Sequence, residues 1–208
     1  DYVNVNHLDA YIISFDIFKA YDKTTIEFVT KVMRKMGFGP EFVSWVETCH
    51  REITTCFILG KLTRELAVAI SLRQGDPAAM PLFLLNMEPL LNFIKNKIQG
   101  IQIGPVKQKS EPYVDDVTAV SSKLEDMRSL NKAFLRFERL SGTVLNRTSK
   151  TKVMGLGGWA GRENWPLTWV KTAPSLRILG INFHPTVAET IRSSWESCSK
   201  GCHYFEFW

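Results

Sequence analysis

The sequence has no long uninterrupted run of apolar residues. Its most apolar stretch, residues 81–94, is broken by Asn86, Glu88 and Pro89, and it is shorter than the roughly 20 residues that a membrane-spanning helix requires. The first residues also lack the basic segment and apolar core of a secretory signal. We therefore expect no membrane partner and an intracellular protein of the nucleus or cytoplasm, not a secreted one, whose first residue is a cut within a longer chain.

Cysteine is scarce, with four residues among 208. This number does not indicate a disulfide framework and favours a reducing compartment. Cys198, Cys202 and His203 form a C-x-x-x-C-H cluster, but its spacing differs from the C-x-x-C pair that is common in zinc sites. We interpret these cysteines as structural or incidental.

The composition is that of a folded domain with a mild excess of positive charge. Hydrophobic residues make up 45% of the chain, enough for one substantial core, or for one core and a small second unit. Lysine and arginine number 26 against 21 aspartates and glutamates, a net charge of +5. This excess suits a polyanionic partner, although an ordinary solvated basic surface explains it equally well.

The periodicity of apolar residues predicts alternating strands and helices. Residues 11–15 (YIISF) read as a buried strand that ends at Asp16. Helices are expected over residues 25–36, 41–50 and 81–97, the last kinked at Pro89, and over a segment lined by Leu124, Met127, Leu130, Phe134, Phe137 and Leu140 that ends at Gly142. Further strands are expected over residues 54–59, 66–72, 101–103 continuing through 112–120, 152–156 and 176–183. The Gly-rich residues 155–160 are not interpreted as a dinucleotide loop, because no helix is expected to open there.

Carboxylates in apolar surroundings are the strongest chemical signal. Asp115 and Asp116 are adjacent within residues 112–120 (PYVDDVTAV), where two negative charges are costly unless a cation compensates them. An exposed Asp-Asp turn is the structural alternative. Asp16 supplies a carboxylate from a separate strand, which is what two-metal phosphoryl transfer requires. Together the three aspartates favour a metal site.

Five blocks of sequence resemble the reverse transcriptase of non-LTR (LINE-like) retrotransposons. Residues 15–22 (FDIFKAYD) resemble its motif A, residues 72–77 (LRQGDP) with 81–83 (PLF) motif B, residues 113–116 (YVDD) motif C, residues 141–150 motif D, and residues 179–181 (LGI) the primer grip. The blocks occur in the family's order, over roughly residues 10–185. The chain therefore resembles a palm domain fragment of such an enzyme.

The resemblance assigns metal-binding and catalytic roles. Asp16, Asp115 and Asp116 would hold two Mg²⁺ ions, with Mn²⁺ as an alternative; one ion lowers the pKa of the primer 3′-hydroxyl and the other neutralises the triphosphate leaving group. Lys150 is the candidate general acid for the departing pyrophosphate. A solvated surface lysine is the alternative for Lys150, and Lys152 competes for the same role.

The resemblance also assigns nucleotide-binding roles. Tyr21 matches the steric-gate position, where an aromatic ring excludes a ribose 2′-hydroxyl; ordinary core packing is the alternative. Arg73, Gln74 and Gly75 are expected on the nucleotide and template side, with the glycine permitting close backbone approach.

Two blocks depart from the family pattern. Family members read R-Q-G-x-P-[LM]-S-P in motif B, whereas here Ala78, Ala79 and Met80 separate Pro77 from Pro81, so that the serine is absent and one residue is extra. In motif D, three residues instead of two separate Asn146 from the lysine. Both departures put the local register in question.

We therefore predict an α+β fold, a polymerase palm whose antiparallel sheet is backed by helices and leads into the start of a thumb. The expected domains are the reverse transcriptase palm over residues 1–158, with its fingers truncated upstream, and the primer-grip region and start of the thumb over 159–208. The predicted function is RNA-directed DNA polymerase, although the fragment alone is not expected to polymerise.

The predicted partners are an RNA template, a DNA primer and deoxynucleoside triphosphates. Upstream fingers and, where the parent protein has one, an endonuclease domain of the same polyprotein complete this set. One alternative is a decayed or domesticated relative that binds nucleic acid without catalysis, which the altered motif B favours. The other is an RNA-dependent RNA polymerase, against which Tyr21 argues, because RNA synthesis must admit the 2′-hydroxyl.

Overall fold

The chain divides into two compact units. The computed structural model describes residues 2–51, 54–55, 66–67, 72–73, 75–114, 116–147 and 150–202. The first unit comprises Asp1–Asp16, Ile94–Lys132 and Asn146–Trp208, and the second comprises Ile17–Phe93 and Ala133–Leu145. Within the described ranges, no helix is long and apolar enough to cross a membrane. The domain boundary expected at residue 158 stays a prediction.

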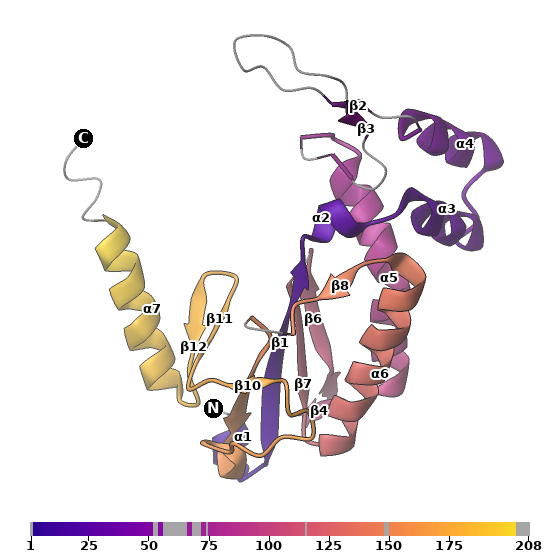
Figure 1. The fold of residues 1–208 in the computed structure, drawn as a ribbon. Helices are drawn as coiled ribbons and strands as arrows, with labels where there is room; N and C mark the ends of the chain where they lie inside the picture. Colours follow the sequence, from indigo (N-terminus) through magenta and orange to yellow (C-terminus); the bar gives the residue numbers. More distant parts are fainter. Residues whose placement is uncertain are drawn as a thin grey trace. The chain divides into compact units, whose positions relative to one another are not determined.

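A mixed sheet is the centre of the first unit. Its strands are β1 (Ala10–Phe18), β6 (Ser110–Tyr113), β7 (Asp116–Ser121), β9 (Lys152–Leu156) and β10 (Lys171–Thr172), in the order β10-β9-β1-β7-β6 (Figure 1). β1 pairs antiparallel with both β7 and β9, whereas β10 pairs parallel with β9. The expectation of an antiparallel sheet is wrong for the β9–β10 pair. β10 has only two residues, and so short a strand leaves no pattern in the sequence from which its direction could be predicted.

β1 shows why Asp16 lies on a different face from the core. Tyr11, Ile13 and Phe15 are fully buried, while Ile12, Ser14 and Asp16 between them are half-buried. Successive side chains of a strand point to opposite faces. The predicted strand is confirmed and extends to Phe18, and the carboxylate of Asp16 lies on the face opposite Phe15.

The segment that carries the paired aspartates is a hairpin and not one continuous strand. β6 and β7 pair antiparallel, with Tyr113 opposite Asp116, and Val114 takes a left-handed backbone conformation with φ of 54°. The strand expected over residues 112–120 therefore reverses direction at the turn. Residues 101–103 form β4 (Ile101–Ile103), which pairs with β5 (Val106–Gln108) in a separate hairpin.

In the first unit, the side chain of Tyr11 packs beside two tryptophan rings. Tyr11 contacts the rings of Trp159 and Trp165 at centroid distances of 6.3 and 5.8 Å, and the guanidinium of Arg162 lies 5.5 Å from both tryptophan rings. Burial raises the pKa of the Tyr11 hydroxyl, and the nearby charge of Asp126 raises it further. This cluster anchors β1 on the side of the sheet opposite Asp16.

Four short elements and one longer helix complete this unit. They are α1 (Tyr2–Val5), the 3-10 turn η1 (Gly157–Trp159), β11 (Leu176–Ile178), β12 (Ile181–Phe183) and α7 (Val187–Cys202). Residues 176–183, expected as strand, are confirmed as a hairpin of β11 and β12. No helix opens after η1 at Ala160, which agrees with rejecting a dinucleotide loop.

The second unit is largely helical. Its elements are α2 (Ala20–Lys23), α3 (Ile26–Lys35), α4 (Pro40–Cys49), β2 (Thr54–Thr55), β3 (Leu66–Ala67), β8 (Val144–Leu145), most of α5 (Ala79–Lys97) and the second half of α6 (Leu124–Ser141). β2 pairs antiparallel with β3, as expected, although most of the two predicted strands lies outside the described residues. β8 pairs with the last two residues of β1, Ile17 and Phe18.

The helices of this unit follow the predicted ranges within a few residues. α6 ends at Ser141, and Gly142 follows it with φ of 77°, which explains the glycine. Leu140 was expected on the apolar face of this helix, but it is 59% exposed because it lies in the last turn of α6.

Candidate active site

Two carboxylates meet on neighbouring strands of the first unit. Asp16 of β1 and Asp116, the first residue of β7, are direct antiparallel partners. Directly opposed residues have Cα atoms roughly 4.5–5.5 Å apart and present their side chains on the same face. The side chain of Asp16 is 29% exposed, and Asp116 is exposed. The register alone therefore places both carboxylates at one accessible point of the sheet.

These carboxylates line a pocket whose remaining charged side chains are basic. The pocket has a volume of about 260 Å³ and is lined by Ser14, Asp16, Asp116, Lys150, Lys152, Leu176 and Arg177. All of these residues belong to the first unit. Carboxylates favour divalent cations, and lysine and arginine favour phosphate oxygens. The lining therefore suits a ligand that combines a divalent cation with phosphate groups, such as a metal-bound polyphosphate.

The two carboxylate oxygens of Asp16 have different neighbours. The side-chain amide of Asn146 donates a hydrogen bond of 3.0 Å to Oδ2, while the ammonium of Lys150 lies 3.6 Å from Oδ1. The backbone N–H of Asn146 also donates to the carbonyl oxygen of Asp16, at 2.8 Å. Asn146 thus holds Asp16 through Oδ2, and Oδ1 faces the ammonium of Lys150.

The donor set fits a hard divalent cation. Mg²⁺ prefers oxygen ligands and is bound in proteins through one or two carboxylates together with substrate phosphates and water. Asp16 and Asp116 supply two carboxylates to one pocket. No group of three or more histidine, cysteine, aspartate or glutamate side chains that could hold a metal occurs among the residues that the structure describes. Asp115, the third predicted ligand, lies outside those residues.

Tyr21, the predicted steric gate, belongs to the second unit. It lies in α2, is half-buried, and its ring centroid is 5.1 Å from that of buried Phe83. Its carbonyl oxygen accepts a hydrogen bond of 2.9 Å from the backbone N–H of Leu72. This bond brings the motif A segment beside the first residue of the motif B segment.

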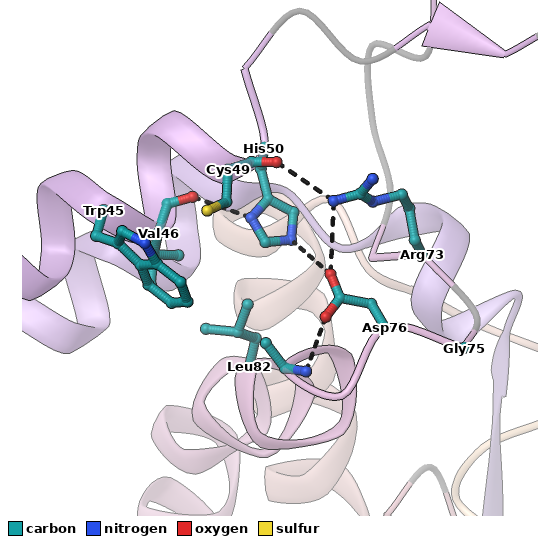
Figure 2. Close-up of a pocket in the computed structure, with 9 residues that line it drawn as sticks. Trp45, Val46, Cys49, His50, Arg73, Gly75, Asp76 and Leu82 are labelled. Carbon is teal, nitrogen blue, oxygen red and sulfur yellow. Dashed lines mark hydrogen bonds and ion pairs between the residues drawn. The ribbon is translucent and has the colours of Figure 1, made fainter.

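Four motif B residues, Arg73, Gly75, Asp76 and Leu82, line a second pocket of about 460 Å³ between α4 and the start of α5 (Figure 2). Arg73 donates to the carbonyl oxygen of Cys49 at 3.4 Å and lies 3.7 Å from Oδ2 of Asp76. Nε2 of His50 lies 3.8 Å from the same oxygen. Asp76 therefore lies close to two basic side chains in a pocket that Trp45 also lines. Gln74, the remaining predicted residue, lies outside the described residues.

The same segment shows how the extra residue of motif B is accommodated. Oδ1 of Asp76 accepts a hydrogen bond of 2.9 Å from the backbone N–H of Ala78, and the N–H of Ala79 donates to the Asp76 carbonyl at 3.0 Å. These bonds form a turn that leads into α5. Gly75 precedes it with φ of 90°, and a Cβ there would have no neighbour within 4 Å, so its backbone conformation is the reason for glycine.

Three residues at this site, Asn146, Ser14 and Arg177, have no role in the sequence prediction. Asn146 was recognised only as part of motif D, and its contact with Asp16 joins residues 130 positions apart. Ser14 and Arg177 were not singled out. Alternation along β1 from Asp16 identifies Ser14, and Arg177 lies just before the LGI block; nothing in the sequence pairs Asn146 with Asp16.

Known proteins resemble this chain in sequence. A family model described as "Reverse transcriptase (RNA-dependent DNA polymerase)" matches residues 1–183. The "Retrovirus-related Pol polyprotein from type-2 retrotransposable element R2DM" of Drosophila melanogaster is 25% identical over 85% of this chain and 18% of the relative. The "Transposon TX1 uncharacterized 149 kDa protein" of Xenopus laevis is 27% identical over 55% of this chain and 9% of the relative. The chain thus spans less than a quarter of the length of these relatives.

Solved structures resemble it in fold. An apo telomerase from Candida tropicalis, truncated from its C-terminal domain, matches with a TM-score of 0.59 and 14% identity over 85% of this chain and 34% of that one. A telomerase from Candida albicans in complex with a fragment of telomeric RNA matches with a TM-score of 0.54 and 14% identity, over 84% of this chain and 29% of that one. At this identity the likeness shows the α+β fold alone.

Proposed function

Because the chain belongs to the reverse transcriptase (RNA-dependent DNA polymerase) family and is related to the Pol proteins of non-LTR retrotransposons, we propose that it synthesises DNA on an RNA template. The substrates are a DNA primer and deoxynucleoside triphosphates. The primer 3′-hydroxyl attacks the α-phosphate, the bond from the α-phosphorus to the new oxygen forms, and the bond to the leaving pyrophosphate breaks.

Asp16, Asp115 and Asp116 would hold the divalent ions, Mg²⁺ or Mn²⁺. When bound, such ions lower the pKa of the attacking hydroxyl and stabilise the charge on the leaving oxygen. Lys150, which lies beside Asp16 in the same pocket, would donate a proton to the departing pyrophosphate. Lys152 and Arg177 attract the phosphates through their charge.

One observation carries this proposal. Asp16 and Asp116 come from motifs that are 100 residues apart, yet they are direct partners in the sheet and line one pocket with three basic side chains. A structural pair of aspartates gains nothing from this arrangement, since opposed like charges destabilise a sheet. Cation-dependent phosphate chemistry explains it.

In the second unit, Tyr21 is proposed to exclude the ribose 2′-hydroxyl, and Arg73, Gln74 and Gly75 are proposed to contact the nucleotide or the template. The chain would act within a larger polyprotein, as its small share of the relatives' length suggests. Fingers and other domains of that polyprotein would complete the grip on the template.

A second candidate function is nucleic-acid binding without catalysis. It is favoured by the altered motif B, in which alanines replace the usual serine segment and contribute to the turn before α5. The two functions differ in whether the primer grows.

Primer extension separates them. A labelled DNA primer on an RNA template is incubated with deoxynucleotides and Mg²⁺ and either the chain or a longer protein that carries it with upstream fingers. We expect extension by the longer protein that stops when EDTA is added. Tight template binding by the longer protein without any extension, in Mg²⁺ or Mn²⁺, would instead support the non-catalytic function.

A further inference from the structure

Asn146 is hydrogen-bonded both to Asp16 of β1 and to Thr151, the residue after Lys150. Its backbone N–H and its side-chain amide both donate to Asp16, at 2.8 Å and 3.0 Å. Its carbonyl oxygen accepts a hydrogen bond of 2.9 Å from the hydroxyl of Thr151, a residue that is 1% exposed. Asn146 is therefore fixed at both of its backbone groups, and its side chain has a defined direction.

This direction makes the oxygens of Asp16 unequal. An amide N–H that donates to Oδ2 occupies one of its lone pairs and limits rotation of the carboxylate. The other oxygen, Oδ1, is the one that faces a positive charge, since Nζ of Lys150 lies 3.6 Å from it. The side chain of Lys150 is 66% exposed, so it can move aside at little cost.

We infer that Asn146 is a positioning residue for the candidate metal site, which turns Oδ1 of Asp16 towards the cation while Lys150 competes for that oxygen until the cation arrives. The inference rests on the proposed function, because it concerns how the same pocket binds its ion. Hydrogen-bonded partners of ligating carboxylates commonly change metal affinity about 10- to 100-fold when they are removed.

The test is a measurement of Mn²⁺ affinity by electron paramagnetic resonance of the free ion, on the chain without nucleotide. Mn²⁺ binding that is present in the wild type and lost in Asp16→Asn is assigned to the candidate site. Asn146→Ala keeps both backbone hydrogen bonds and loses only the amide, so it should fold and bind Mn²⁺ about 10- to 100-fold more weakly. The matched control is Asn164→Ala, an exposed asparagine of the same unit that does not line the pocket, and its affinity should equal that of the wild type.

Lys150→Met supplies an independent readout that does not depend on the stability of Asn146→Ala. The substitution removes a positive charge within 4 Å of Oδ1. The attraction between two unit charges at this distance is about 1 kcal/mol in water, so Mn²⁺ should bind about 5-fold more tightly once Lys150 no longer competes. Unchanged affinity in a folded Asn146→Ala, or weaker affinity in Lys150→Met, would overturn the inference while leaving the proposed function in place. A wild-type chain that binds no Mn²⁺ at Asp16 would contradict the proposed function itself.

Discussion

Single side chains decide what the two pockets can do. In the first unit, Asp16 combines a half-buried position with one amide donor and one nearby ammonium, an environment that suits an ionised ligand. In the second unit, Tyr21 packs its ring against Phe83, which gives it a structural role as well as the proposed role in sugar selection. The two roles are separable by experiment.

Tyr21→Ala should lower sugar selectivity more than activity. If the ring excludes the 2′-hydroxyl by a steric clash, alanine opens that space and ribonucleotide incorporation rises, while deoxynucleotide incorporation changes less. Single-nucleotide incorporation with each sugar, expressed as a ratio of kcat/KM values, measures the effect.

The control for this experiment is Phe15→Ala. Phe15 is fully buried, so its truncation should cost about 3–5 kcal/mol of folding stability without a change in sugar choice. A Tyr21→Ala variant that is destabilised but keeps the wild-type ratio would show that Tyr21 is only a core residue.

Among the helices and strands, the start of α6 is held by one buried carboxylate. Asp126 is 4% exposed, and its Oδ2 accepts hydrogen bonds from the backbone N–H groups of Gln99 and Gly100 and from the hydroxyl of Ser121, at 2.8, 2.9 and 2.5 Å. It therefore ties α6 both to the segment that leaves α5 and to the end of β7. β7 is the strand that begins with Asp116.

Asp126→Ala should destabilise the protein by about 3 kcal/mol, because it leaves buried donors without an acceptor. Urea unfolding monitored by circular dichroism measures the change. Glu125→Gln alters the neighbouring exposed carboxylate, and it should stay within about 0.5 kcal/mol of the wild type. Similar stabilities for the two variants would mean that Asp126 is not a structural anchor.

The sequence predicted those elements whose burial follows a simple period. β1, α3, α4, α6 and β9 all lie within a few residues of the predicted ranges, since alternation or helical spacing of apolar residues marks each of them. A turn beside Val114 was considered only as an alternative to a continuous strand, because a β-branched residue with positive φ contradicts local preference.

Local sequence patterns also predicted only part of the site. Asp16, Asp116 and Lys150 were proposed from motifs, and they line one pocket. The role of Asn146 was not predicted, because its contact depends on the pairing of β1 with β8 just before it, and such tertiary geometry leaves no local pattern. Asp115 and Gln74 lie outside the described residues, and their roles stay predictions.

At the scale of the whole molecule, the net charge of +5 suits a polyanionic template. Charge alone is a weak argument, but Arg177 is exposed and lines the pocket with the carboxylates, where a nucleic-acid phosphate would meet it. If Arg177 makes one phosphate contact, the affinity for a primer–template duplex should fall less steeply with salt concentration after Arg177 is removed.

Arg177→Ala should weaken duplex binding and reduce the slope of log K against log salt by about 1. Fluorescence anisotropy over a series of KCl concentrations measures the slope. Arg128→Ala removes an exposed arginine of α6 in the same unit, outside the lining of the pocket, and should leave the slope unchanged. Equal slopes for wild type and Arg177→Ala would exclude this phosphate contact.

The central claim is that the carboxylates at the β1–β7 pair carry out metal-dependent DNA synthesis, and Asp16→Asn tests it most directly. The substitution keeps the size of the side chain and removes the charge that holds the ion. In the longer protein with upstream fingers, RNA-templated primer extension should fall about 1000-fold, or about 4 kcal/mol of transition-state stabilisation, while template affinity stays within about 2-fold because basic side chains, and not Asp16, contact the phosphates. Glu163→Gln, at an exposed glutamate outside this pocket, should extend like the wild type. Undiminished extension by a folded Asp16→Asn protein would contradict the claim.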